Sequence, residues 1–161
     1  MRYLSGEDEK EAKSFLDGAA EVARPATCQR HRCGSVIVSE GKTVGSGFNS
    51  PPANAEDQRR CSVQKDSYNK RVTDKTCCVH AEQRAIMDAL SKNPSLIRGS
   101  RLYFIRLGPD GTATRSGKPY CTICSKMALD AGIAEFVLWH DNGVCVYNTG
   151  EYNTLSFQYD E

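Results

Sequence analysis

The chain has 161 residues, of which 39% are hydrophobic and 25% are charged, a composition typical of one globular domain over residues 1–161 rather than of a disordered or fibrous protein. Its 21 Lys and Arg residues nearly balance 20 Asp and Glu residues, so the net charge of +1 provides no general attraction to nucleic acid or to an anionic membrane. The acidic N-terminus and the lack of a long apolar run predict a soluble, cytoplasmic protein without a signal peptide or a membrane span.

The first half of the chain predicts a helix, a hairpin and a long loop. Apolar residues recur every three or four positions over residues 7–23, which indicates a helix that ends before Pro25. Two short β-rich segments, 34–38 and 43–48, flank a Glu-Gly turn and predict a β-hairpin. Residues 50–76 are polar and have no clear period. We expect them to form either a functional loop or a partly helical segment, and to shape a site.

The second half predicts alternating helices and strands. An apolar stripe over residues 79–91 indicates a helix, and residues 101–107 have the composition of a buried strand. A loop leads to a further helix over residues 121–131, and the next strand is expected at residues 134–140. These two strands should be parallel because a helix connects them, giving an α/β sandwich. The alternating tail, residues 143–161, predicts an extended or hairpin-like end.

Two predicted helices begin with residues that can hold a metal. Without an export signal, the eight cysteines are better explained as metal ligands, small buried groups or redox thiols than as a disulfide framework. His80 and Glu82 begin one helix, and Cys121 and Cys124 begin the next. Helix N-termini favour thiolates, and one His with two Cys leaves a tetrahedral zinc an open fourth position. We predict a catalytic zinc held by His80, Cys121 and Cys124, with Glu82 as the proton carrier.

Each part of this group has a simpler explanation when it is taken alone. The CxxC pair could be a redox pair or half of a structural zinc ribbon, although the sequence has no second CxxC. His80 could cap its helix, and Glu82 could be a solvated acid that complements the helix dipole. A zinc-stabilised binding module is a non-enzymatic alternative, but a closed structural site has no use for an unligated acid. The combination favours the catalytic site.

The pattern H-x-E followed by C-x-x-C, in CCVHAEQRAI at residues 77–86 and CTIC at residues 121–124, resembles the signature of zinc deaminases. Most of the chain is similar to the cytidine and deoxycytidylate deaminase superfamily, and to its deoxycytidylate branch through Gly47-Phe48-Asn49. The resemblance implies a three-layer α/β/α sandwich with a mixed sheet. It also implies hydrolytic deamination of a cytosine nucleotide or nucleoside, nominally dCMP to dUMP. Asn49 and Ala81 would bind the substrate, and the chain would form a homo-oligomer.

Two features depart from the family pattern and leave other substrates open. Tyr120 stands directly before Cys121, where the family has proline, and an extra stretch runs from about residue 108 to residue 118. The alternative substrates are a tRNA adenosine, a guanine, or a modified or antibiotic-like nucleoside. Nucleic acid is the less favoured partner, because scattered loop cations are typical of a solvated face or of a site for one substrate phosphate. These cations are Arg59, Arg60, Lys65, Lys70 and Arg71.

Other cysteines lie near the predicted zinc ligands in sequence. Some deoxycytidylate deaminases hold a second, structural zinc with a cysteine six residues before the first-strand glycine, where Cys28 precedes Gly34 here. The resemblance implies that the candidate ligands of a second zinc are Cys28, Cys61, Cys77 and Cys78, and it leaves His31 as a fourth ligand or a surface residue. The alternative is that these cysteines are small buried groups, as we expect for Cys145 in the core.

Overall fold

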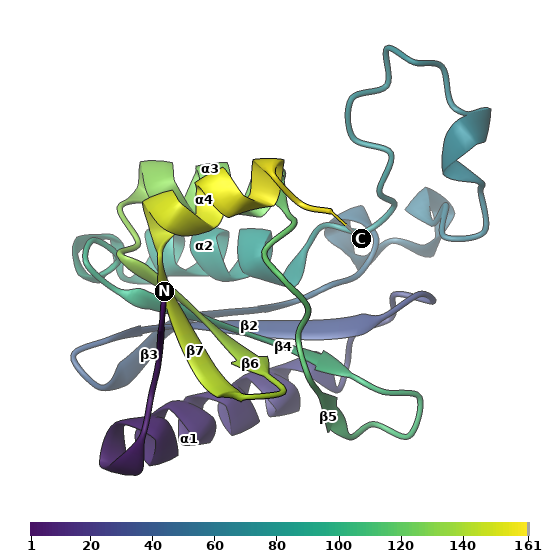
Figure 1. Cartoon of the computed structure of the whole chain (residues 1–161). Helices are drawn as coiled ribbons and strands as arrows, with labels where there is room; N and C mark the ends of the chain where they lie inside the picture. Colours follow the sequence, from purple (N-terminus) through teal and green to yellow (C-terminus); the bar gives the residue numbers. More distant parts are fainter. Residues whose placement is uncertain (161) are drawn as a thin grey trace.

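The computed structural model describes residues 1–160, in which a mixed sheet carries helices on both of its faces (Figure 1). The strands are β1 (Arg2–Tyr3), β2 (Arg32–Ser39), β3 (Lys42–Phe48), β4 (Arg101–Leu107), β5 (Ala113–Thr114), β6 (Glu135–His140) and β7 (Gly143–Asn148). Their order is β1-β7-β6-β4-β2-β3, and β5 pairs with β4. The helices are α1 (Gly6–Ala23), α2 (Ala81–Lys92), α3 (Thr122–Ala131) and α4 (Thr149–Phe157).

The predicted three-layer α/β/α sandwich is confirmed. Figure 1 shows α1 on one face of the sheet and α2, α3 and α4 on the other. Apolar side chains from both faces of the sheet fill two cores, one under each helix layer. Strands β4 and β6 are parallel, as predicted from the helix between them, whereas the other paired strands are antiparallel. The predicted hairpin turns at Glu40 and Gly41, which both have positive φ angles as a tight hairpin turn requires.

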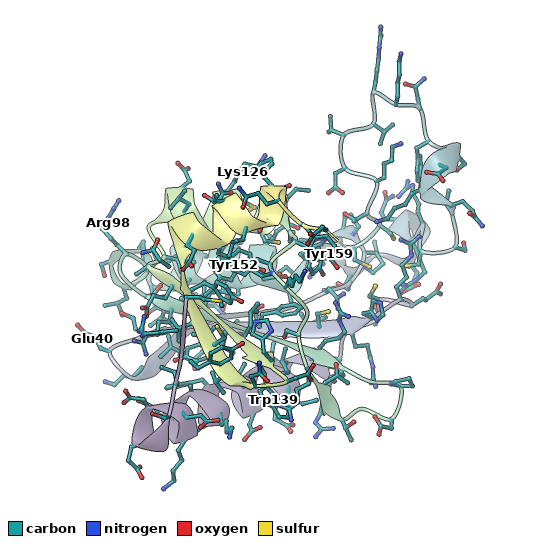
Figure 2. The ribbon with its side chains drawn as sticks, in the orientation of Figure 1. Glu40, Arg98, Lys126, Trp139, Tyr152 and Tyr159 are labelled. Atoms are coloured by element: carbon teal, nitrogen blue, oxygen red, sulfur yellow. The ribbon has the colours of Figure 1, made fainter. Side chains whose placement is uncertain are left out.

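The predicted extended tail is wrong over residues 149–157. Strand β7 pairs with β6, but the chain then forms helix α4, whose first turn is capped because the Asn148 side chain accepts a hydrogen bond from the Gly150 N–H at 3.0 Å. Figure 2 shows Tyr152 between α4 and the sheet, and its ring stacks on Phe136 with 4.0 Å between ring centroids. The packing of Tyr152 on Phe136 therefore favours a helix in a segment whose polar and apolar residues alternate as in a strand.

The two irregular segments also have defined structures. In the extra stretch before α3, strand β5 folds back on the end of β4, so that Thr114 pairs with Arg106. The long loop contains three short 3₁₀ segments, Pro52–Asn54, Glu56–Gln58 and Lys65–Ser67, and part of it projects from the body of the molecule (Figure 1). The loop is therefore partly helical, as one of the two expectations had it, but its helical parts are short 3₁₀ turns and not an α-helix.

Two glycines of β3 allow α2 to pack closely against the sheet. A Cβ atom added to Gly47 would lie 2.5 Å from the Ala81 carbonyl oxygen, and one added to Gly45 would lie 2.6 Å from the Ala85 carbonyl oxygen. Because real Cβ atoms do not approach backbone this closely, only glycine allows the first turns of α2 to pack so near the sheet.

Among residues 1–160, no helix combines the length and the apolar composition that crossing a bilayer requires.

Candidate zinc site

The N-termini of α2 and α3 bring the predicted metal ligands together. His80 directly precedes α2, and its N–H donates to the Gln83 side-chain oxygen at 2.9 Å, which closes the first turn. Cys121 directly precedes α3, and its Sγ accepts the Cys124 N–H at 3.4 Å. Hydrogen bonds within each first turn therefore fix the backbone that carries these side chains.

The three ligand atoms have the spacing of a zinc site. The His80 Nδ1 atom lies 3.3 Å from Cys121 Sγ and 3.2 Å from Cys124 Sγ. In a tetrahedral site with Zn–N near 2.0 Å and Zn–S near 2.3 Å, the nitrogen and each sulfur are about 3.5 Å apart. A hydrogen bond with Cys124 lowers the pKa of Cys121 to about 4 against the opposing effect of burial, which favours the thiolate. The donor atoms and their separations fit zinc.

Glu82 lies beside this group and lines a small pocket. The residue is only 6% exposed, and it lines a cavity of about 100 Å³ together with His80 and Asn49. Burial raises the pKa of Glu82 to about 6, although the nearby charge of His80 acts in the opposite direction. A buried carboxyl group at this place can hold a proton and release it to a bound molecule.

The two predicted substrate-binding residues also line the pocket. The Asn49 Oδ1 atom accepts the Cys33 N–H at 2.8 Å, and its Nδ2 donates to the His31 carbonyl oxygen at 2.8 Å. An amide side chain offers two donors and two lone pairs, so Asn49 keeps one of each for a ligand. Ala81 is fully buried in the first turn of α2, where backbone N–H groups have no acceptor within the helix.

Sequence reasoning missed four other residues of this pocket, Arg30, Cys33, Phe104 and Arg106. Cys33 and Arg106 are directly paired across β2 and β4, so their side chains lie on one face of the sheet. The only signal in the sequence was the charged Arg106 inside the otherwise apolar strand RLYFIRL. Its position in the pocket follows from the strand register, which the sequence did not define.

Three further cysteines form a second group beside the pocket, and one of them, Cys28, also lines it. The thiol sulfurs of Cys28, Cys61 and Cys78 lie within 4.8 Å of one another, and the Cys61 and Cys78 sulfurs are 3.8 Å apart. Two thiolates on a tetrahedral zinc are about 3.8 Å apart. Burial would raise the pKa of Cys61, but hydrogen bonds from the Gln29 backbone, Cys77 and Arg59 lower it to about 7. These thiols therefore fit a second zinc.

The structure does not bring Cys77 and His31 into this second group. The Cys77 sulfur accepts the Arg60 N–H at 2.8 Å. Among the described residues, Cys77 belongs to neither group of three ligand atoms that lie within 4.8 Å of one another. His31, considered either as a fourth ligand or as a surface residue, is exposed and does not join either group of ligand atoms. Cys145 is fully buried in the core, as predicted.

The second group predicts that the protein binds two zinc ions per chain. Cys61→Ser should lower the zinc content by one ion per chain and should also lower the melting temperature, because a metal bound only by the folded chain stabilises it. Metal analysis and thermal unfolding measure both effects. Cys145→Ser is the matched control, because Cys145 belongs to neither group of ligand atoms, and it should keep two ions. A wild-type content of one zinc ion per chain, unchanged in Cys61→Ser, would show that the second group binds no metal.

Comparison with known proteins agrees with the site geometry. Residues 9–140 match the model of the cytidine and deoxycytidylate deaminase zinc-binding region. A deoxycytidylate deaminase from Pongo abelii is 29% identical over 139 residues, which cover 86% of this chain and 67% of that protein.

Solved structures share the fold. The dCMP deaminase of cyanophage S-TIM5, determined in complex with dCMP and dUMP, has a TM-score of 0.55 and 21% identity, with 83% of this chain and 82% of that chain covered. Cytidine deaminase from Burkholderia pseudomallei has a TM-score of 0.56 and 17% identity, with 87% and 94% covered. The family model matches well over half of the residues and includes both zinc-ligand segments. This chain therefore belongs to the cytidine and deoxycytidylate deaminase family.

Proposed function

We propose that this protein deaminates dCMP to dUMP by hydrolysis and releases ammonia. The observation that carries the proposal is the buried Glu82 carboxyl group beside three zinc-type ligands, in a pocket of about 100 Å³. A closed structural zinc site would not need such an acid. Membership of the deaminase family and the dCMP and dUMP bound to the cyanophage relative support this choice of substrate.

His80, Cys121 and Cys124 would hold the zinc ion. Zinc bound there would lower the pKa of a water molecule so that it can act as a nucleophile at neutral pH. Glu82 takes a proton from the attacking water and delivers it to the ring nitrogen next to C4. A C4–O bond forms, and Glu82 then transfers the proton of the new C4 hydroxyl group to the amino group. The C4–N bond breaks, ammonia leaves, and the C4 oxygen becomes a carbonyl oxygen of uracil. The two protons of the water molecule are thus accounted for in the products, which are the uracil nucleotide and ammonia.

Backbone and amide groups would orient the base and the sugar. Asn49 presents its remaining donor and acceptor from a side chain that is held by one hydrogen bond to Cys33 in β2 and one to His31, the residue before β2. The Ala81 N–H opens into the same pocket from the first turn of α2. A ligand fixed by these groups and by Glu82 would lie between the end of the hairpin and the start of α2, which favours reaction through orientation.

Ammonia release from a panel of substrates tests the proposed function. The zinc-loaded protein should act on dCMP and should be much slower on adenine and guanine nucleotides and on transfer RNA. Cytosine, deoxycytidine and cytidine monophosphate complete the panel and define the preferred sugar and phosphate. Turnover of a transfer RNA adenosine or of guanine, with none of the cytosine compounds, would replace this proposal with another deaminase activity.

We propose that the chain is a homo-oligomer, although two tyrosines of its tail add no exposed apolar surface for contact between chains. Tyr147 and Tyr152 are buried in the chain's own core rather than exposed. Support comes instead from large apolar side chains exposed on the outer helix layer, namely Met87, Leu90, Leu129 and Phe157. Light scattering at micromolar concentration should give a mass of at least two chains, and a monomeric mass would contradict this proposal.

The single-domain organisation and the cytoplasmic location stay predictions from the sequence.

A further inference from the structure

An arginine in the catalytic pocket has no anionic partner. Arg106 is half-buried on β4, and its Nε atom is buried without a hydrogen-bond acceptor. Within residues 1–160, no carboxylate oxygen lies within 4.0 Å of its guanidinium nitrogens. Desolvating a guanidinium group without an acceptor is costly, so a charged group of this kind is usually paired. Arg106 is therefore ready to accept a partner from outside the chain.

The neighbour of Arg106 within the strand pair does not neutralise it. Cys33 stands opposite Arg106 in the β2–β4 register. Burial raises the pKa of Cys33 to about 12, despite the opposing charge of Arg106, so the thiol stays neutral at physiological pH. The positive charge of Arg106 is consequently available to a ligand in the pocket.

Arg106 also lines a larger cavity that adjoins the catalytic pocket. This outer cavity has a volume of about 460 Å³ and shares Arg106, Arg30 and His31 with the catalytic pocket, and Arg32 contributes a third arginine. No Asp or Glu belongs to its lining as the structure describes it. The nearby Asp110 carboxylate accepts hydrogen bonds from the Thr112 N–H and hydroxyl. The outer cavity therefore has a cationic wall, and it shares Arg106 with the pocket that Glu82 lines.

We propose that Arg106 determines substrate specificity by binding the phosphate of the nucleotide while the base occupies the catalytic pocket. This inference rests on the proposed function and adds a residue to it. A guanidinium group matches phosphate in charge and can donate two parallel hydrogen bonds to it. Of the loop cations first considered for this role, Arg59 is less suitable because it already pairs with Glu56 at 2.6 Å.

Kinetics with and without the phosphate test this role. In Arg106→Gln, kcat/KM for dCMP should fall by about 10- to 150-fold, mainly through KM, because hydrogen bonds to charged groups have this effect on affinity. The value for deoxycytidine should not change, and Arg106→Lys should restore part of the loss. Arg115→Gln is the matched control, since Arg115 already donates to the His140 carbonyl oxygen and lies over the Trp139 ring.

Binding measurements separate this inference from the proposed function. Titration calorimetry on the zinc-loaded protein should show weaker binding of dUMP and of inorganic phosphate in Arg106→Gln, with no change in Arg115→Gln. If the wild type deaminates no cytosine compound, the proposed function fails, but the phosphate titration still decides the role of Arg106. Equal losses for dCMP and deoxycytidine, or unchanged phosphate binding in Arg106→Gln, would overturn the inference.

Discussion

Glu82→Gln should lower the turnover number by roughly 10²- to 10⁴-fold while the protein keeps its fold and its zinc. Glutamine has nearly the same shape as glutamate, so the 6% exposed side chain should remain in place beside the ligands. Its amide cannot take a proton from water and return it to the ring nitrogen and the amino group. Metal analysis, thermal unfolding and ammonia release from dCMP measure the three properties separately.

Two variants make this result specific to the acid at residue 82. Glu21→Gln is the same substitution at an exposed position of α1, where the carboxylate pairs with Arg24, and it should leave turnover unchanged. Glu82→Asp retains a carboxyl group but shortens the side chain, and should recover part of the activity. Near wild-type turnover by a zinc-loaded Glu82→Gln protein would remove Glu82 from the mechanism.

The zinc-ligand group could be predicted from the sequence because its determinants are local. His80 and Glu82 belong to one first turn, and Cys121 and Cys124 belong to another, so helix periodicity and N-terminal chemistry define each half. Joining the halves needed only the order of helices and strands, from which the parallel pairing of β4 and β6 was also predicted. The glycines Gly45 and Gly47 then bring α2 against the sheet.

The remaining features depend on contacts that no local pattern defines. Helix α4 is stabilised by the packing of Tyr152 on Phe136 in the core. The polar and apolar residues of this segment nevertheless alternate as in a strand. Strand β5 exists because the extra stretch can pair with the end of β4. Arg106 reaches the pocket through its register with Cys33, and a shift of one residue would place its side chain on the other face of the sheet. Charge inside a buried strand was the one clue.

Cys121→Ala should remove one zinc ion per chain and abolish activity, because His80 and Cys124 alone hold zinc poorly. The loss should also lower the melting temperature, since a metal present at about 1,000 times its dissociation constant contributes about 4 kcal/mol to folding. Helix α3 loses its N-cap acceptor in the same variant, because Cys121 Sγ accepts the Cys124 N–H. Metal content must therefore be measured on protein shown to be folded by circular dichroism.

Cys145→Ala provides the matched control for this loss of metal. Cys145 is fully buried in β7 and belongs to neither group of metal-type ligands, so its replacement should lower stability while zinc content and activity are retained. A folded Cys121→Ala protein that kept all of its zinc would show that another side chain ligates the metal. If zinc content and activity fall together only in Cys121→Ala, the effect comes from a lost ligand and not from general destabilisation. The thiol at the start of α3 then links the fold to the chemistry, because one sulfur caps the helix and holds the metal beside Glu82.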